Sequence, residues 1–181
     1  AYLPGRVAEK YKNSRIVAFS TGNVYPFVNV GKNISSEDMA VNPVGEYAQS
    51  CLGRERVLTY FSHKNQTPLL LFRLNYAIDL RYGVLLEIAK SVREGRPIDL
   101  TMGNVNVIWQ GDANEYAIRS LLHANHPPQI LNVTGPETLS VRWLAEEFSK
   151  RLGVEALFSN EEDTHALLNN AAKAHHLFGY P

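Results

Sequence analysis

Two short apolar runs with a helical stretch between them most constrain what this chain can fold into. The runs are Arg15 to Ser20 (RIVAFS) and Leu69 to Leu74 (LLLFRL), and neither alternates regularly between polar and apolar residues. Strands that are buried on both faces have this pattern, and they occur in parallel sheets. From Val44 to about His63, apolar residues recur at spacings of three and four, which predicts a helix that Pro68 ends. A strand, a helix and a second strand predict a parallel α/β unit.

The second half of the chain continues this alternation of strands and helices. Asp112 and Ser140 are expected to cap two of the helices, because their side-chain oxygens can accept hydrogen bonds from free N–H groups. The pattern predicts helices at Val84–Glu94, Asp112–Ala124, Ser140–Leu152 and Asp163–Leu177, and strands at Ile98–Thr101, Val105–Gln110, Ile130–Thr134 and Ala156–Ser159.

Composition argues against several classes of function. The 18 basic and 18 acidic side chains cancel, so no net field favours nucleic acid or an anionic membrane. Even the longest apolar runs, such as Leu69 to Phe72, are far too short to span a bilayer. The single cysteine, Cys51, excludes an internal disulfide and fits a reducing compartment, so we expect a cytoplasmic protein. His123 and His126 lack a second pair of ligands, so no metal site is expected.

Three stretches place polar side chains at strand ends and at a helix start. They are Ser20-Thr21-Gly22-Asn23-Val24-Tyr25, Tyr47-x-x-Ser50-Cys51-x-x-x-Glu55 and Phe72-Arg73-Leu74-Asn75. In order and spacing they resemble the extended short-chain dehydrogenase/reductases, the NAD-dependent epimerases and dehydratases. The patterns of that family are Ser-x-x-x-x-Tyr, Tyr-x-x-Ser-Lys-x-x-x-Glu and Arg-x-x-Asn, although the last pair is one residue closer here. The likeness runs from Arg15 to about Gly153.

The resemblance implies a fold and a division of the chain. We expect an α/β structure made of part of a Rossmann-like parallel sheet with flanking helices, plus a small C-terminal α/β substrate-binding subdomain. Residues 1–80 would form the C-terminal part of the Rossmann-like domain. Residues 81–181 would mainly form the subdomain, with one strand and one helix returning to the sheet. The resemblance also implies a homodimer that pairs through the Tyr47 helix and the helix before it.

The resemblance also assigns roles to individual residues. Tyr47 would be the acid/base and, together with Leu74 and Tyr76, would contact NAD or NADP. Thr21 would hydrogen-bond the same substrate oxygen as Tyr47. We also predict a group of residues that bind a small-molecule substrate: Gly22, Asn23, Asn75 and Arg81.

The chain departs from the family pattern at three places. Cys51 stands where the family has the lysine that stabilises the tyrosine anion and holds the nicotinamide ribose, and a neutral thiol supplies no such charge. We expect Arg81 to be a better substitute than Arg54, which lies about two helical turns beyond Tyr47. Val105 stands where nucleotide-sugar enzymes commonly have an arginine, which makes a diphosphate-sugar substrate less expected.

The third departure is that no G-x-x-G-x-x-G or G-x-G-x-x-G turn occurs in the chain. We expect that turn in a preceding half, without which this chain would be inactive. The sequence therefore predicts part of an NAD(P)-dependent oxidoreductase or epimerase/dehydratase that acts on a hydroxyl group of a sugar-like or small polyol substrate.

Other interpretations of these residues stay open. The protein could be a dinucleotide-fold binding or regulatory protein that lost its acid/base chemistry together with the lysine. Tyr47 could be an ordinary structural tyrosine, and Cys51 a small buried apolar residue. Glu55 could be a structural carboxylate that holds the backbone, Arg54 or Arg56.

Overall fold

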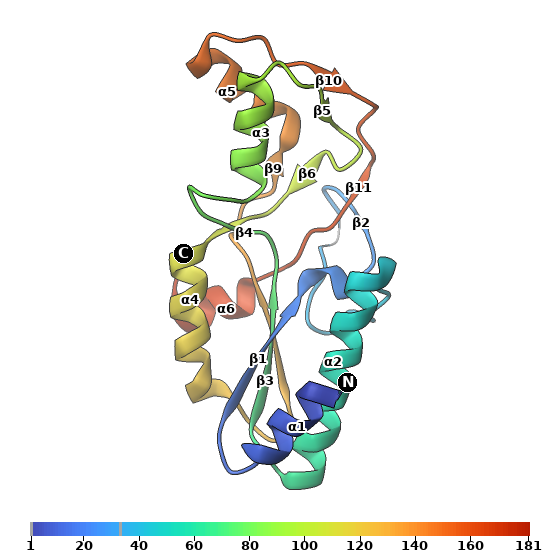
Figure 1. The fold of residues 1–181 in the computed structure, drawn as a ribbon, viewed down its shortest axis with the longest axis vertical. Helices are drawn as coiled ribbons and strands as arrows, with labels where there is room; N and C mark the ends of the chain where they lie inside the picture. Colours follow the sequence, from blue (N-terminus) through green and yellow to red (C-terminus); the bar gives the residue numbers. More distant parts are fainter. Residues whose placement is uncertain (1, 33) are drawn as a thin grey trace.

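The centre of the molecule is a parallel sheet of three strands. The computed structural model describes residues 2–32 and 34–181. β1 (Ile16–Thr21) pairs with β3 (Leu69–Leu74), and β3 pairs with β8 (Gln129–Val133), in the order β1-β3-β8. The two apolar runs are thus neighbouring parallel strands, and β8 comes from the second half of the chain (Figure 1). The predicted parallel α/β fold is confirmed.

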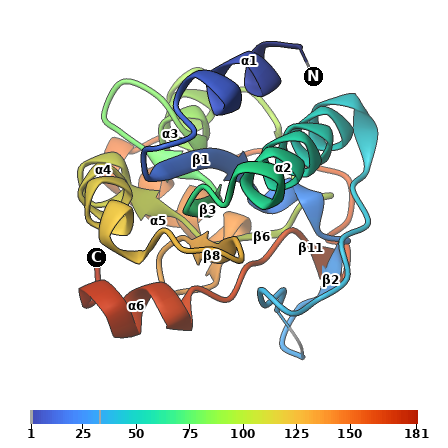
Figure 2. The same cartoon turned by 90° about the horizontal axis from the view of Figure 1, so that it is seen from below.

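Helices cover both faces of this sheet. α1 (Tyr2–Lys10) and α2 (Gly45–Asn65) pack on one face, where Ala8 and Leu58 meet Leu69 and Leu71. α4 (Gln110–Arg119) and α6 (Ala172–Phe178) pack on the other. Figure 2 shows the sheet between these two layers of helices. Burial of apolar side chains on both faces explains why the strands are continuously apolar.

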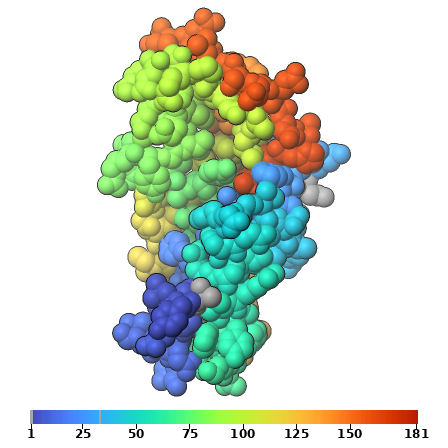
Figure 3. Space-filling view, turned by 45° about the vertical axis from the view of Figure 1, so that its right-hand side comes forward, coloured from blue at the N-terminus to red at the C-terminus, as the bar shows by residue number. Residues whose placement is uncertain are grey.

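A smaller part with its own core lies beyond the carboxyl ends of the strands. Its two helices pack on one another, and Figure 3 shows its green and orange segments above α2. It contains α3 (Val84–Arg93), β5 (Ile98–Asp99), β6 (Asn104–Val105), β9 (Leu139–Ser140), α5 (Val141–Leu152) and β10 (Phe158–Ser159). Short pairings join it to the larger part: β4 (Ala77–Ile78) with β7 (Ile108–Trp109), and β2 (Val28–Asn29) with β11 (His165–Ala166).

The predicted helix Asp163–Leu177 is wrong in its first half. Residues 163–171 contain the short strand β11 and an extended segment, and only α6 is helical. The backbone of this segment pairs with a distant loop: the N–H of Val30 donates to the carbonyl of Thr164, and that of Ser35 to the carbonyl of Leu168. These tertiary hydrogen bonds replace the helical ones, which overrides a weak local helix propensity.

One predicted cap is wrong and the other is confirmed. α4 begins at Gln110 with Trp109 at its N-cap, so Asp112 lies within the first turn and caps nothing. A carboxylate is still favourable there, beside the positive end of the helix dipole. Ser140 caps α5, because its hydroxyl oxygen accepts a hydrogen bond from the N–H of Trp143. α5 then ends at Gly153, which has the left-handed conformation.

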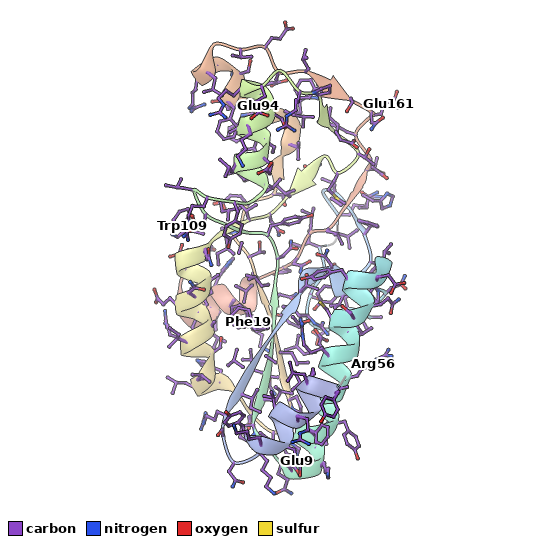
Figure 4. All side chains as sticks on the ribbon, viewed as in Figure 1. Glu9, Phe19, Arg56, Glu94, Trp109 and Glu161 are labelled. Carbon is purple, nitrogen blue, oxygen red and sulfur yellow. The ribbon has the colours of Figure 1, made fainter. Side chains whose placement is uncertain are left out.

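The outer edge of β1 is open and apolar. No strand in residues 2–32 and 34–181 pairs with it, and Phe19 on this strand is 49% exposed (Figure 4). The surface beside it, which we call the β1-edge patch, is a groove of about 440 Å³; its apolar residues are Val7, Tyr11, Ile16, Val17, Phe19, Ala117, Ile118 and Leu121. The outer edge of β8 differs, because Glu37 accepts from the N–H of Asn132 and Lys173 donates to the carbonyl of Ile130.

No helix within the described ranges is both long enough and apolar enough to cross a membrane.

Candidate functional site

Thr21 ends β1 at the carboxyl edge of the sheet, where open α/β sheets bind ligands. The side chain is buried, and its hydroxyl oxygen accepts a hydrogen bond from the N–H of Asn23 at 3.2 Å. The hydroxyl also lies 3.3 Å from Oδ1 of Asn23. Asn23 therefore holds the Thr21 hydroxyl at the start of the short 3₁₀ helix Gly22–Val24.

Tyr47 lies in the first turn of α2 and meets Thr21 and Cys51. Its side chain is 63% exposed, and Thr21 and Cys51 lie close enough to its hydroxyl to influence the pKa of the phenol. α2 begins at Gly45, so Tyr47 and Cys51 are both helical. They lie one helical turn apart on the face of α2 that packs on β1. The three residues predicted to be catalytic are therefore neighbours.

The surroundings of Tyr47 raise the pKa of its phenol above the ordinary value of about 10. Burial of the hydroxyl is the largest cause, and the neighbouring Cys51 acts in the same direction. The polar hydroxyl of Thr21 and the positive charge of Arg54 lower the pKa, but they do not outweigh the first two effects. The site as it stands thus favours the neutral phenol.

Arg54, rather than Arg81, is the cation near this tyrosine. Nη2 of Arg54 lies 3.5 Å from Sγ of Cys51, and the Nε atom of Arg54 is buried without a hydrogen-bond partner among the described residues. Arg81 is exposed and its guanidinium binds the carboxylate of Asp79. The long side chain of Arg54 reaches back by one turn toward Cys51, whereas Arg81 binds Asp79, so the preference for Arg81 over Arg54 is not supported.

A buried ion pair lies beneath these residues. Nε and Nη2 of Arg73 donate to the two carboxylate oxygens of Glu55 at 2.9 and 2.7 Å, and Ser20 donates to the same carboxylate at 2.5 Å. Nη1 of Arg73 donates to the hydroxyl of Tyr25, which donates in turn to Oδ1 of Asn132. The network ties α2 to all three strands.

This network corrects the interpretation of Glu55. Its partner is Arg73, which is 3% exposed, and not Arg54 or Arg56. Burial lowers the pKa of the Arg73 guanidinium, but the hydrogen bonds and charges of Glu55 and Tyr25 together raise it by more, so Arg73 stays protonated. One signal in the sequence could have indicated this pair: Arg73 is the only charged residue in an apolar run that is buried on both faces.

Asn75 lies at the carboxyl end of β3, beside Gly22. Its Nδ2 atom donates to Oδ1 of Asn106 at 2.8 Å, and the side chain is 1% exposed. Nδ2 of Asn106 donates to the backbone carbonyl of Asn169 at 2.7 Å. Asn106 and Asn169 were not singled out from the sequence. Asn169 falls within the segment predicted to be the helix Asp163–Leu177, so no local signal marked it.

The remaining predicted site residues lie elsewhere or stay predictions. Leu74 ends β3 and packs partly against the main core. Tyr76 has φ of +43°, an uncommon value for a residue with a side chain, and packs against the core of the smaller part. Its contact with a nicotinamide ring stays a prediction, as does a substrate contact of Arg81.

The described residues contain no group of three or more His, Cys, Asp or Glu side chains that could hold a metal ion.

Solved structures share this fold. UDP-glucuronic acid 4-epimerase from Bacillus cereus, in complex with UDP-glucuronic acid and NAD, matches 99% of this chain with a TM-score of 0.82 and 16% identity. UDP-glucose 4-epimerase from Thermus thermophilus, in complex with NAD, matches 98% with a TM-score of 0.77 and 18% identity. dTDP-glucose 4,6-dehydratase from Bacillus anthracis, in complex with NAD, matches 97% with a TM-score of 0.78 and 15% identity.

These similarities establish the fold. This chain covers 61%, 63% and 59% of those three proteins, respectively, which is less than two thirds of each. No family model and no curated protein sequence matches the chain. The chain thus has the fold of NAD-dependent epimerases and dehydratases, as its motifs predicted, at a low level of sequence identity.

Proposed function

We propose that this chain, which folds like the epimerases and dehydratases, supplies the acid/base and substrate-binding residues of an NAD(P)-dependent enzyme of that kind. The reaction would take place at a hydroxyl group of a sugar-like or small polyol substrate. The observation that carries this proposal is the proximity of Thr21, at the end of β1, and Tyr47, in the first turn of α2, at the carboxyl edge of the sheet. Two hydroxyl groups that meet at such an edge can both contact one substrate oxygen.

In the proposed mechanism, Tyr47 exchanges a proton with the substrate hydroxyl. The Thr21 hydroxyl hydrogen-bonds the same oxygen and orients it toward the phenol. Asn23 holds the Thr21 hydroxyl, and the Glu55–Arg73 pair holds α2 against the strands, so both catalytic hydroxyls are fixed before substrate binds. When bound, the nicotinamide supplies the chemistry of accepting and returning a hydride.

The residues present fit the nicotinamide end of the cofactor but not its pyrophosphate. Tyr47 is exposed at the sheet edge, and Leu74 ends the neighbouring strand, so both are accessible to a ring or ribose there. The chain has no glycine-rich turn whose backbone N–H groups could bind a pyrophosphate. We propose that further strands, carrying that turn, pair with the open edge of β1 and cover the β1-edge patch, since a long exposed apolar edge is unfavourable in water.

The proposed acid/base role needs a source of positive charge. A phenol acts as a base near neutral pH only when its anion is stabilised. We propose that Arg54 supplies part of this stabilisation, because it contacts Cys51 and its charge lowers the pKa of Tyr47. Its effect is smaller than that of burial, so bound cofactor or substrate would have to contribute the rest.

One observation favours an alternative function. The pKa of Tyr47 is raised in this chain, and the buried thiol of Cys51 contributes to that rise. A protein that uses this fold only to bind a dinucleotide or a sugar has no need of a phenolate. A catalytically inactive binding or regulatory protein is therefore the second candidate.

Mutation of Tyr47 separates the two candidates. The protein that carries this chain together with a dinucleotide-binding segment would be assayed for conversion of a panel of sugars and polyols to products, because an enzyme that returns the hydride releases no NADH. We expect Tyr47→Phe to lower turnover about 10²–10⁴-fold while NAD still binds. Tyr60→Phe is the matched control, because Tyr60 is an exposed tyrosine on the same helix. Equal turnover of Tyr47→Phe and wild type would refute the catalytic role, and NAD binding without turnover of any substrate would favour the binding protein.

We propose that the protein forms a homodimer through α1 and α2. Tyr2, Leu3 and Tyr60 on these helices are exposed apolar side chains that such an interface would bury. Sedimentation at micromolar concentration checks this, and a strict monomer would contradict it. A cytoplasmic location stays a prediction.

A further inference from the structure

A polar cavity lies at the amino ends of the strands, opposite the Thr21–Tyr47 site. It has a volume of about 440 Å³ and lies between the 3₁₀ helix Ser120–His123, α6 and the first residues of β8. Figure 1 shows these strand ends at the bottom of the molecule, away from the smaller part. β1 has 6 residues, so the two sites are separated by about 20 Å at about 3.3 Å per residue. We call this feature the basic cavity; its polar lining includes Arg15, His123, Asn125, Gln129 and Lys173.

Two cations of the basic cavity have no carboxylate partner. Nη1 of Arg15 donates to the backbone carbonyls of Leu121 and Leu122 at 3.3 and 3.0 Å. Nζ of Lys173 donates to the carbonyl of Ile130 at 2.9 Å. No aspartate or glutamate lines the cavity, and neither cation forms an ion pair with a residue that the structure describes. Their positive charges are therefore not balanced within the cavity.

The hydrogen-bonding groups that stay available in the basic cavity are mostly donors. Nε and Nη2 of Arg15 and the remaining N–H groups of Lys173 make no hydrogen bond with the described residues. Oδ1 of Asn125 accepts from the N–H of His126 at 2.8 Å, which leaves its Nδ2 group as a donor. The nearby carbonyls already accept from the two cations. The cavity therefore suits a ligand whose oxygen atoms accept hydrogen bonds and do not donate them.

Phosphate and carboxylate groups have this property. Their ionised oxygens only accept, and the bonds that Arg or Lys donate to them are charge-assisted, hence short and strong. An uncharged hydroxyl compound could use the same donors but would leave both charges unbalanced. The chain as a whole has 18 basic and 18 acidic side chains, so no broad positive field favours nucleic acid or an anionic membrane. The charge is concentrated instead in a cavity of the size that holds small molecules.

We infer that the basic cavity binds a small anion, a molecule that carries a phosphate or carboxylate group, and that Arg15 and Lys173 are its cationic ligands. The hydrogen bonds of these side chains to backbone carbonyls hold both cations at the cavity before a ligand arrives, which lowers the entropic cost of binding. This second ligand site goes beyond the proposed function, because neither Thr21 nor Tyr47 lines the cavity.

Calorimetric titration tests this inference. The protein that carries this chain would be titrated with inorganic phosphate, citrate and D-glucose 6-phosphate, with NAD present to fill the proposed dinucleotide site. We expect at least one of these anions to bind with a dissociation constant below about 1 mM and to shift the NMR resonance of the Asn125 side-chain amide. Its affinity should fall at least about tenfold in Lys173→Gln and in Arg15→Gln, because each variant loses a charge-assisted hydrogen bond. Binding of phosphate alone would identify a phosphate site, and binding of citrate alone a carboxylate site.

Lys10→Gln is the matched control, because Lys10 lies over the ring of Tyr11 and outside the cavity. It removes the same charge and should change the affinity by less than about twofold, since salt screens distant charges. Glutamine can still donate to the backbone carbonyls, and circular dichroism checks that each variant is folded. Equal affinity of wild type and both cavity variants would overturn the inference, as would the absence of binding by all three anions. D-glucose that binds as tightly as D-glucose 6-phosphate would overturn the assignment to an anion.

Failure of the inference and failure of the proposed function remain distinguishable. Tyr47→Phe should leave anion binding at the basic cavity unchanged, because the two sites lie at opposite ends of β1. Anion binding that depends on Lys173, in a protein without turnover, would leave this inference standing and refute the catalytic proposal. Turnover that depends on Tyr47, in a protein that binds no anion at this cavity, would do the reverse.

Discussion

Nδ2 of Asn169 lies 1.9 Å from the place that a Cβ atom on Gly22 would occupy. Glycine at this position therefore admits the asparagine to the end of β1. The two residues are 147 positions apart in the chain (169 − 22), so their contact depends on how the extended segment before α6 returns to the sheet.

This contact predicts that Gly22→Ala is destabilising. The added methyl group would overlap Asn169, and such overpacking typically costs about 1–3 kcal/mol. Asn169→Ala should remove most of that cost, so urea unfolding of the two single variants and the double variant should show a favourable coupling between them. Purely additive effects would show that the two side chains do not compete for this space.

Breaking the buried ion pair should destabilise the fold strongly. Arg73→Met or Glu55→Leu leaves one charge buried without its partner, which typically costs about 3–5 kcal/mol. The double variant should lose less than the sum of the two, because no lone charge remains. Chemical denaturation measures both. Lys90→Met, which removes an exposed pair with Glu87, is the control and should change stability by less than about 1 kcal/mol. A loss that small for Arg73→Met would contradict the burial of this pair.

The ionisation of Tyr47 should respond to nearby charge in a defined direction. Arg54 lowers the pKa of the phenol, so Arg54→Leu should raise it further. Cys51→Lys should lower it by about one unit or more, because it removes the thiol and places a cation one turn away. NMR titration of labelled tyrosine follows both shifts. Cys51→Ala is the control without added charge. An unchanged Tyr47 pKa in Arg54→Leu would rule out Arg54 as the cation of the site.

Activity of the same Cys51→Lys variant tests how the missing lysine is compensated. If the site has only lost its cation, turnover in the longer protein should rise. If Arg54 and the bound ligands already provide the charge, a second cation should leave turnover unchanged or lower it through repulsion. A large gain would therefore contradict the compensating role of Arg54.

This chain by itself should bind NAD weakly. Affinity for a pyrophosphate depends on backbone N–H groups at a glycine-rich turn and a helix N-terminus, and the chain encodes no such turn. Calorimetric titration of the 181-residue chain should therefore give a dissociation constant well above the micromolar range. Micromolar affinity would mean that the dinucleotide site has been placed wrongly.

Local patterns were sufficient to predict the central architecture and three neighbouring site residues. The apolar runs that became β1 and β3 identified buried parallel strands, because only side chains covered on both faces remain apolar without alternation. The spacing of Tyr47 and Cys51 placed them on one face of α2, because four residues make about one helical turn. Thr21 lies beside them because it ends a parallel strand at the carboxyl edge of the sheet.

Contacts between distant segments could be identified only from the tertiary structure. The sequence alone determined which stretches are strands or helices and which strand ends carry polar groups, because these follow from the period of the apolar residues. Only the folded chain decided that Glu55 pairs with Arg73, that Arg54 and not Arg81 lies near Tyr47, and that Asn169 meets Gly22. The physical reason is that hydrogen bonds and ion pairs between distant segments do not require any periodic pattern in the sequence. They arise only when packing brings those segments together, and they can then override local preferences, as in the extended residues before α6.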